Sequence, residues 1–192
     1  MTDAGHTTAV MSEPMDSPAN RIGVALAVIA LAARLSRAVR VGQIDESIYQ
    51  HALVLDGGGS TALHLPPHPE ATKGDLLAGI DNIMLLAVSG SALTTDEVLT
   101  DVFDRFDPTS ADSITGLRVM VSQVRNAFAH RPWQPSWNIK PAHRGVFEVA
   151  LANGMRFEFD TRNLHGERLK PEDFGGIEFW VSLLQYCQNI VG

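Results

Sequence analysis

The chain has 192 residues, of which 45% are hydrophobic and 19% charged, a balance typical of a globular domain with a substantial core and not of a disordered chain. Its formal net charge of −7 argues against a protein that coats nucleic acid without specificity, because that binding depends on an excess of Lys and Arg. The single cysteine, Cys187, excludes an internal disulfide or a cysteine zinc cluster within one chain, and we expect a cytoplasmic protein.

The first element in chain order is a long helix. Residues 1–16 are polar and lack periodicity, so we expect a flexible tail followed by a single domain over residues 17–192. Ser17-Pro18 supplies an N-cap and a first-turn proline, and Gly42 supplies a stop, which together predict a helix over residues 18–41.

The longest apolar run, Ile22 to Ala33, lies inside this helix. It is shorter than the roughly 20 residues that cross a bilayer. Acidic residues precede it where a signal peptide carries positive charge, namely Asp3, Glu13 and Asp16. We therefore predict a central helix buried nearly all round and no association with a membrane.

The middle of the chain alternates between helices and loops. Ile44 to Leu55 is consistent with a short helix, and glycines and prolines predict loops at residues 56–60 and 65–69. Helical spacing of apolar residues then predicts a helix from Lys73 to Ala92. Thr94 to Glu97 fits a capping box that would begin a further helix, ending before Pro108.

The clearest helix lies between Ser110, which can cap it, and Pro132, which forbids its continuation beyond about His130 or Arg131. Its apolar residues recur three and four apart and predict one buried stripe: Ile114, Leu117, Val121, Val124 and Phe128. Polar residues, including Arg118 and Arg125, fall off that stripe, so we expect them to face solvent.

A β-hairpin should follow this helix. Phe147 to Leu151 and Met155 to Asp160 flank Asn153-Gly154, the pair preferred in a type I′ turn. A broad apolar face from Glu172 to Val191 predicts the last helix. The sequence therefore predicts a mainly α fold, a bundle of about five helices with one β-hairpin before the C-terminal helix.

One group of side chains has the composition of a chemical site: Arg125, Asn126 and His130. No acidic residue occurs between Asp112 and Glu148, so this group lies in a locally basic segment of an acidic chain. A His near a helix C-terminus can exchange a proton near neutral pH, and an Arg offers a fork of donors that matches phosphate oxygens. The absence of carboxylates favours phosphodiester cleavage without a divalent metal.

Simpler explanations apply to the same residues. A His at a helix end often only bonds terminal carbonyls, and an Arg-Asn pair is often a solvated surface. Trp133 and Trp137 can stack on bases, but aromatics beside a helix end more often pack against its neighbours. His64 and His68 lie in a Pro-rich segment without a fixed ligand geometry, so we predict no metal site there.

The segment Val124-Arg125-Asn126-Ala127-Phe128-Ala129-His130 resembles the signature of the HEPN superfamily, in which an Arg, usually followed by a polar residue, precedes a His by a short spacer. The resemblance implies an all-helical bundle and a metal-independent endoribonuclease that needs no cofactor. It implies that two copies of the motif form the site across a homodimer, with Arg125, Asn126 and His130 as catalytic residues. Many members are toxins or immunity effectors, so an antitoxin partner is also implied.

The resemblance covers one helix closely, and the hairpin around Asn153-Gly154 is not part of the family's core pattern. Some members have lost cleavage and only bind nucleotides or partners. Two hypotheses therefore stay open. The first is an RNA-cleaving or nucleotide-binding homodimer, and the second is a non-catalytic helical interaction module or regulator. A His130 that is buried and capped by its own chain would favour the second.

Overall fold

The structure is a computed structural model that describes residues 17–56, 62–104, 107–109 and 114–192. Within these residues it has four α-helices: α1 (Pro18–Arg40), α2 (Lys73–Phe103), α3 (Thr115–Phe128) and α4 (Gly176–Val191). Two antiparallel hairpins accompany them, β1 (Leu53–Asp56) with β2 (Ala62–Leu65), and β3 (Val146–Ala150) with β4 (Arg156–Asp160). The predicted mainly α fold, with a hairpin before the C-terminal helix, is confirmed. The predicted tail over residues 1–16 lies outside the described residues.

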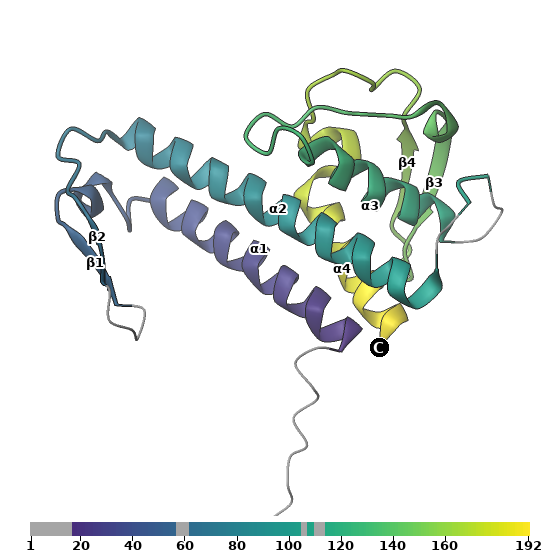
Figure 1. The fold of residues 1–192 in the computed structure, drawn as a ribbon, viewed down its shortest axis with the longest axis horizontal. Helices are drawn as coiled ribbons and strands as arrows, with labels where there is room; N and C mark the ends of the chain where they lie inside the picture. The colour runs from purple at the N-terminus through teal and green to yellow at the C-terminus, as the bar shows by residue number, and fades with distance from the viewer. Residues whose placement is uncertain (1–16, 57–61, 105–106, 110–113) are drawn as a thin grey trace, which may run out of the picture.

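Helices α1 and α2 form a long antiparallel pair (Figure 1). α1 follows the prediction: the Ser17 side chain accepts a hydrogen bond from the Asn20 amide at 3.2 Å, and Gly42 adopts a φ of 76° just beyond the C-cap. At one end of the pair, α3, α4 and the β3–β4 hairpin gather around the second half of α2. At the other end lies the small β1–β2 hairpin (Figure 1).

The predicted break near residue 93 is wrong, because α2 continues without interruption from Lys73 to Phe103. Its capping box lies at the N-terminus, where Thr72 and Asp75 bond each other's backbone amides. Thr95, inside the expected second box, is completely buried, as are Ala92 and Val98. Burial of one continuous helix face therefore outweighs the local capping signal.

The predicted helix over residues 44–55 is also wrong. Asp45 caps a single turn of 3-10 helix, η1 (Glu46–Tyr49), and the chain then enters β1, where Leu53 pairs with Leu65 of β2. Two short apolar segments separated by glycines are typical of a hairpin, a pattern that the helical interpretation overlooked. The expected loop at residues 57–60 lies outside the described residues.

Helix α3 lies between α2 on one side and β3 on the other. Every residue from Thr115 to Val124 is buried, so the predicted apolar stripe is confirmed from Leu117 to Phe128. The backbone of β3 comes so close that a Cβ on Gly116 would lie 2.1 Å from the Glu148 carbonyl oxygen. The predicted cap at Ser110 lies outside the described residues.

The β3–β4 hairpin is confirmed, with Val146 opposite Asp160 and Ala150 opposite Arg156. The type I′ turn is wrong, because that turn needs two residues with positive φ and here only Gly154 has one. The Leu151 amide bonds the Met155 carbonyl at 2.9 Å, which leaves a three-residue loop closed by a left-handed glycine.

The last helix begins later than predicted. A 3-10 turn, η3 (Pro171–Phe174), leads to Gly175 with a φ of 87°, and α4 starts at Gly176. A Cβ at Gly175 would lie 2.9 Å from the Phe179 ring, so a glycine is needed both for the backbone and for the space. From there Trp180, Leu183 and Leu184 are fully buried against the other helices.

α1 is less buried than its composition predicts. Ile22, Ile29 and Ala32 are in the core, but other apolar residues face outward on α1 (Val24, Val28, Leu31) and on α2 (Ile83, Leu86, Leu93). We call these six residues the apolar stripe. Both helices are long and apolar enough to cross a membrane, with 28% and 33% of the relevant windows buried. The expectation of a helix buried nearly all round is therefore wrong, because α1 packs on α2 and α4 along one side only.

The close approach of α3 and β3 generates a stability prediction. Replacing Gly116 with Ala forces β3 away from α3 and should lower the free energy of unfolding by about 1–3 kcal/mol or more. Gly90 of α2 has no atom within 4 Å of its Cβ position, so Gly90→Ala should instead stabilise the fold by about 0.4–1 kcal/mol. Urea unfolding of the two variants measures both effects, and equal effects at the two positions would contradict this packing.

Candidate functional site

The end of α3 carries the three residues singled out in the sequence. The regular helix stops at Phe128, two residues before the predicted end, and the Ala129 amide bonds the Asn126 carbonyl at 3.3 Å. His130 lies just beyond the helix and is exposed, while Arg125 and Asn126 in the last turn are half-buried. A His130 buried and capped by its own chain, which would favour the non-catalytic module, is therefore not what the structure has.

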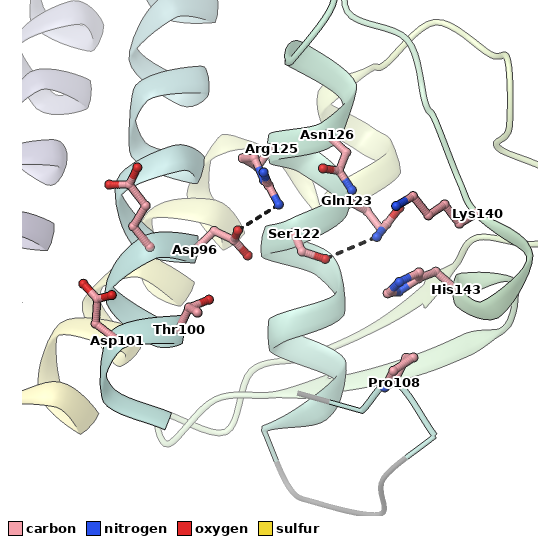
Figure 2. A pocket seen from close by; sticks show the side chains of 11 residues that line it. Asp96, Thr100, Asp101, Pro108, Ser122, Gln123, Arg125, Asn126, Lys140 and His143 are labelled. Carbon is pink, nitrogen blue, oxygen red and sulfur yellow. Dashed lines mark hydrogen bonds and ion pairs between the residues drawn. The ribbon is translucent and has the colours of Figure 1, made fainter. Parts of the chain in front are cut away.

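Arg125 reaches across to α2, where its Nη2 lies 3.1 Å from the Asp96 carboxylate (Figure 2). The Asp96 side chain is 18% exposed and that of Arg125 40%. Burial raises the pKa of Asp96 above its usual value, although the charges of Arg125 and Arg118 act in the opposite direction. The Nε of Arg125 is buried without a hydrogen-bond partner, so the guanidinium keeps a donor for another group.

A cavity of about 680 Å³ opens beside this ion pair, between α2 and α3, and we call it the α2–α3 cavity. Asp96 and Thr100 contribute from α2, Gln123, Arg125 and Asn126 from α3, and Lys140 from the following loop (Figure 2). The volume falls within the range of small-molecule sites, about 300–1,000 Å³.

Ser122 and Gln123 are buried polar residues in the wall of this cavity, and Gln123 is the more deeply buried. It is 1% exposed, and its Nε2 donates to the Ser122 hydroxyl at 3.2 Å, while its Oε1 has no hydrogen-bond partner. A buried acceptor without a partner costs about 1–3 kcal/mol, so such an atom in a cavity wall calls for an explanation.

Acidic residues also line the cavity, but each of them has a cation. Glu97 and Asp101 both pair with Arg21 of α1, at 3.1 Å each, and Asp96 pairs with Arg125. Lys140 adds a further positive charge. The cavity therefore has no large excess of either sign.

A second, smaller cavity of about 320 Å³ lies at the end of α3. It is lined by His130 and Arg131 together with Asn126, Ser136 and Trp137 and, in the part of the chain that the structure describes, by no acidic side chain. We call it the His130 cavity. Trp137 is buried and donates its indole N–H to Asp173 at 2.8 Å, which confirms that it packs the helix end. The same expectation is wrong for Trp133, which is 57% exposed.

The structure places the predicted residues in two adjoining cavities. Arg125 lines the α2–α3 cavity, His130 lines the other, and Asn126 lines both. The expectation that Arg118 faces solvent is wrong: it is 6% exposed and donates to the Phe103 carbonyl at 3.4 Å. β3 and the chain after α2 cover the face of α3 that an isolated amphipathic helix would expose.

Sequence reasoning missed Asp96 and Gln123. Asp96 lies far from the motif in sequence, within an acidic stretch that resembled an ordinary solvated face. Gln123 is the one long uncharged polar side chain between Thr115 and Val124. Every other residue there is small or apolar, except Arg118. A polar residue in a helix buried on all sides was the available signal, but the burial itself came only with the fold.

Other chemistries receive no support from the residues that the structure describes. No group of three His, Cys, Asp or Glu side chains is placed to hold a metal ion among them. Burial raises the pKa of the Cys187 thiol to about 12, so this cysteine is not an activated nucleophile.

Comparisons of the chain with protein-family models, with curated proteins and with solved structures each found no match.

The burial of Asp96 predicts how stability changes with pH. The pKa of Asp96 is higher in the folded chain than its unfolded value of 3.8. Protonated Asp96 therefore stabilises the fold. This stabilisation is lost as the pH rises from the unfolded pKa through the raised pKa of the folded chain. Relative to wild type, Asp96→Asn should therefore become more stable as the pH rises from about 4 to about 7.

Asp160 is the control with the opposite sign, because its bonds from Arg162 lower its pKa to about 2. Ionised Asp160 stabilises the fold at pH values above its unfolded pKa, and this stabilisation is lost as the pH falls toward 2. Asp160→Asn should therefore become less stable relative to wild type as the pH rises from about 2 to about 5. Urea titrations across this range measure both trends, and two trends of the same sign would show that Asp96 is not desolvated.

Proposed function

We propose that this protein is a HEPN-like endoribonuclease that acts as a homodimer and cleaves RNA without a divalent metal, with Arg125, Asn126 and His130 as catalytic residues. The observation that carries the proposal is the exposure of His130 at the end of α3, in a cavity without acidic lining residues among those described. A proton carrier beside Arg131, in a cavity without acidic lining residues among those described, suits a phosphodiester better than a cationic substrate.

The proposed chemistry uses the 2′-hydroxyl that RNA has and DNA lacks. His130 would take the proton of the attacking 2′-hydroxyl or give a proton to the leaving oxygen, and Arg125 would stabilise the charge on the phosphoryl oxygens. The P–O bond to the 5′-oxygen breaks as the bond to the 2′-oxygen forms. The products are therefore a 2′,3′-cyclic phosphate and a free 5′-hydroxyl.

A second copy of the chain is part of this proposal, because Arg125 and His130 of one chain line different cavities. The apolar stripe gives a surface for that copy. Arg21 of α1 pairs with Glu97 of α2, so these two residues lie on the same side of the helix pair. Val24 and Val28 follow Arg21 at helical spacing, and Leu93 lies one turn before Glu97. Both halves of the apolar stripe therefore lie on one face. Leu93 is one turn before Asp96, which makes this face continuous with the α2–α3 cavity.

Cleavage of mixed RNA in EDTA tests the function. Wild-type protein should release 2′,3′-cyclic phosphate ends and leave DNA intact. His130→Ala should lower the rate by about 10²–10⁴ because it removes the proton path. Arg125→Lys should also slow cleavage, since Lys keeps the charge but loses the planar fork.

His51→Ala serves as the matched control, because His51 is exposed and lies two residues before β1, whose hairpin is at the far end of the α1–α2 pair (Figure 1). Activity that EDTA abolishes, or that survives in His130→Ala, would contradict the mechanism. A pure protein that binds partners but cleaves no RNA would favour the non-catalytic interaction module.

The homodimer is tested by light scattering. Wild type at micromolar concentration should have twice the mass of one chain. Leu31→Glu, at the centre of the stripe and 58% exposed, should shift it to a monomer that keeps its helical content. Val146→Glu, at an apolar residue of β3 that is 44% exposed, should leave the mass unchanged. A wild-type monomer would contradict a site formed by two copies of the chain. Binding of the apolar stripe to lipid vesicles in place of self-association would contradict it as well.

A further inference from the structure

We propose that Trp133 is a platform on which an unpaired base stacks, so that the site beside it takes single-stranded and not double-stranded nucleic acid. This inference rests on the proposed function in one respect: the phosphate next to the stacked base is the one placed in the His130 cavity. The stacking contact itself does not depend on cleavage and can be measured with a strand that cannot be cleaved.

The first observation is the exposure of a large aromatic ring. Trp133 is 57% exposed, whereas the other two tryptophans of the chain, Trp137 and Trp180, are 1% and 0% exposed. Among the residues that the structure describes, Trp133 is the one exposed aromatic side chain. Tryptophan is a highly buried residue type on average, so a ring with this exposure indicates a contact with another molecule.

The second observation is the place of this ring at the edge of the His130 cavity. The Gln134 amide bonds the Arg131 carbonyl at 3.1 Å, which closes a turn with Trp133 at its third position. The chain then returns to α3, where the Ser136 amide bonds the Ala127 carbonyl at 3.3 Å. Both ends of this loop line the His130 cavity, so the ring lies on the loop that encloses it.

Trp133 is also close enough to His130 for one nucleotide to contact both. Three chain steps of about 3.8 Å join the two Cα atoms, which are therefore at most about 11 Å apart. The two side chains extend from these atoms, so the phosphate of a nucleotide can lie at the imidazole while a base lies on the indole.

The third observation is the charge around the ring. From residue 127 to residue 145 every charged side chain is positive, namely Arg131, Lys140 and Arg144. A bridge between Ser136 and Arg168 joins this segment to a neighbouring loop, which adds one exposed acid, Glu167, beside Arg168 and Lys170. Basic side chains around an exposed aromatic ring are typical of surfaces that bind single strands, because cations neutralise the phosphates and rings stack on the bases.

The same surroundings fit a protein partner less well. The centre of a protein interface is depleted of charged residues. The exposed neighbours of Trp133 in its loop include His130, Arg131 and Gln134, which are all polar. The apolar stripe, which suits a second copy of the chain, lies on other helices, α1 and α2.

Stacking also selects the state of the nucleic acid. In a duplex each base is paired and stacked between its neighbours, so an indole at the protein surface cannot reach its face. In a single strand a base can leave the stack and lie against an aromatic side chain, whatever its identity. Trp133 therefore favours unpaired strands without a strong preference for sequence.

Binding of a short 2′-O-methyl RNA strand in EDTA tests the proposal, because this strand lacks a free 2′-hydroxyl and cannot be cleaved. Tryptophan fluorescence reports on the contact, since Trp133 is the one exposed tryptophan of three. The strand should quench the fluorescence of wild type and leave that of Trp133→Phe unchanged, because the two remaining indoles are buried. A duplex of the same sequence should bind about 5- to 150-fold more weakly, which is the contribution of stacking one base.

Anisotropy of a labelled strand measures the affinity of the variants. Trp133→Ala should weaken binding by about 5- to 150-fold, while Trp133→Phe keeps a ring and should stay within about 5-fold of wild type. Ile48→Ala removes a side chain of similar exposure, 53%, and should leave the affinity unchanged. Because both side chains are exposed, all three variants should keep the helical content of wild type.

Equal affinity for the strand and the duplex, no binding of the strand, or equal affinity of Trp133→Ala and wild type would overturn the proposal. A Trp133→Ala protein that is a monomer beside a dimeric wild type would also overturn it, because the ring would then contact a second copy. If the strand binds through Trp133 but RNA is not cleaved, the platform stands and the ribonuclease function fails. RNA cleavage together with an affinity that Trp133→Ala does not change gives the reverse result.

Discussion

The burial of α3 on both sides is the constraint on which the rest of the structure depends. α2 covers one face, and β3 approaches the other so closely that only a glycine fits at position 116. The polar side chains from Thr115 to Gln123 therefore cannot reach bulk water, and each needs a partner inside the fold or a cavity. Arg118 donates to the Phe103 carbonyl at the end of α2, Ser122 donates to the Val119 carbonyl, and Gln123 keeps an oxygen without a hydrogen-bond partner.

The same constraint explains why Asp96 and Arg125 face each other. Both project into the space between α2 and α3, where the Asp is desolvated and its pKa rises, so the ion pair compensates charge more than it stabilises the fold. Glu97, the next residue of α2, and Asp101, just over one turn later, instead pair with Arg21 of α1. The acidic stretch of α2 is thus divided between two neighbouring helices, and the cavity between α2 and α3 keeps a nearly balanced charge.

Sequence reasoning succeeded where one local pattern agreed with the packing. The Ser17 cap, the buried apolar residues of α3 up to Phe128 and the β3–β4 hairpin all follow from residues close together in the chain. It failed where tertiary contacts decided. Thr94 to Glu97 has the composition of a capping box, but Thr95 is buried in an unbroken helix. Arg118 looked exposed because nothing in the sequence indicated that β3 would cover the second face of α3. Asp96 and Arg125 are 29 positions apart, and only the fold brings them together.

The end of α3 also separates two physical environments. The buried Gln123 and the half-buried Asp96–Arg125 pair lie in a space with a low dielectric constant, where polar interactions are strong. His130 is exposed beyond the last turn and can reach water. One helix spans both environments because its burial ends with the helix itself: from Thr115 to Val124 every residue is buried, and residues 129–134 are exposed. Arg125 and Asn126 occupy the boundary between these two environments, and for that reason they can contact groups in both.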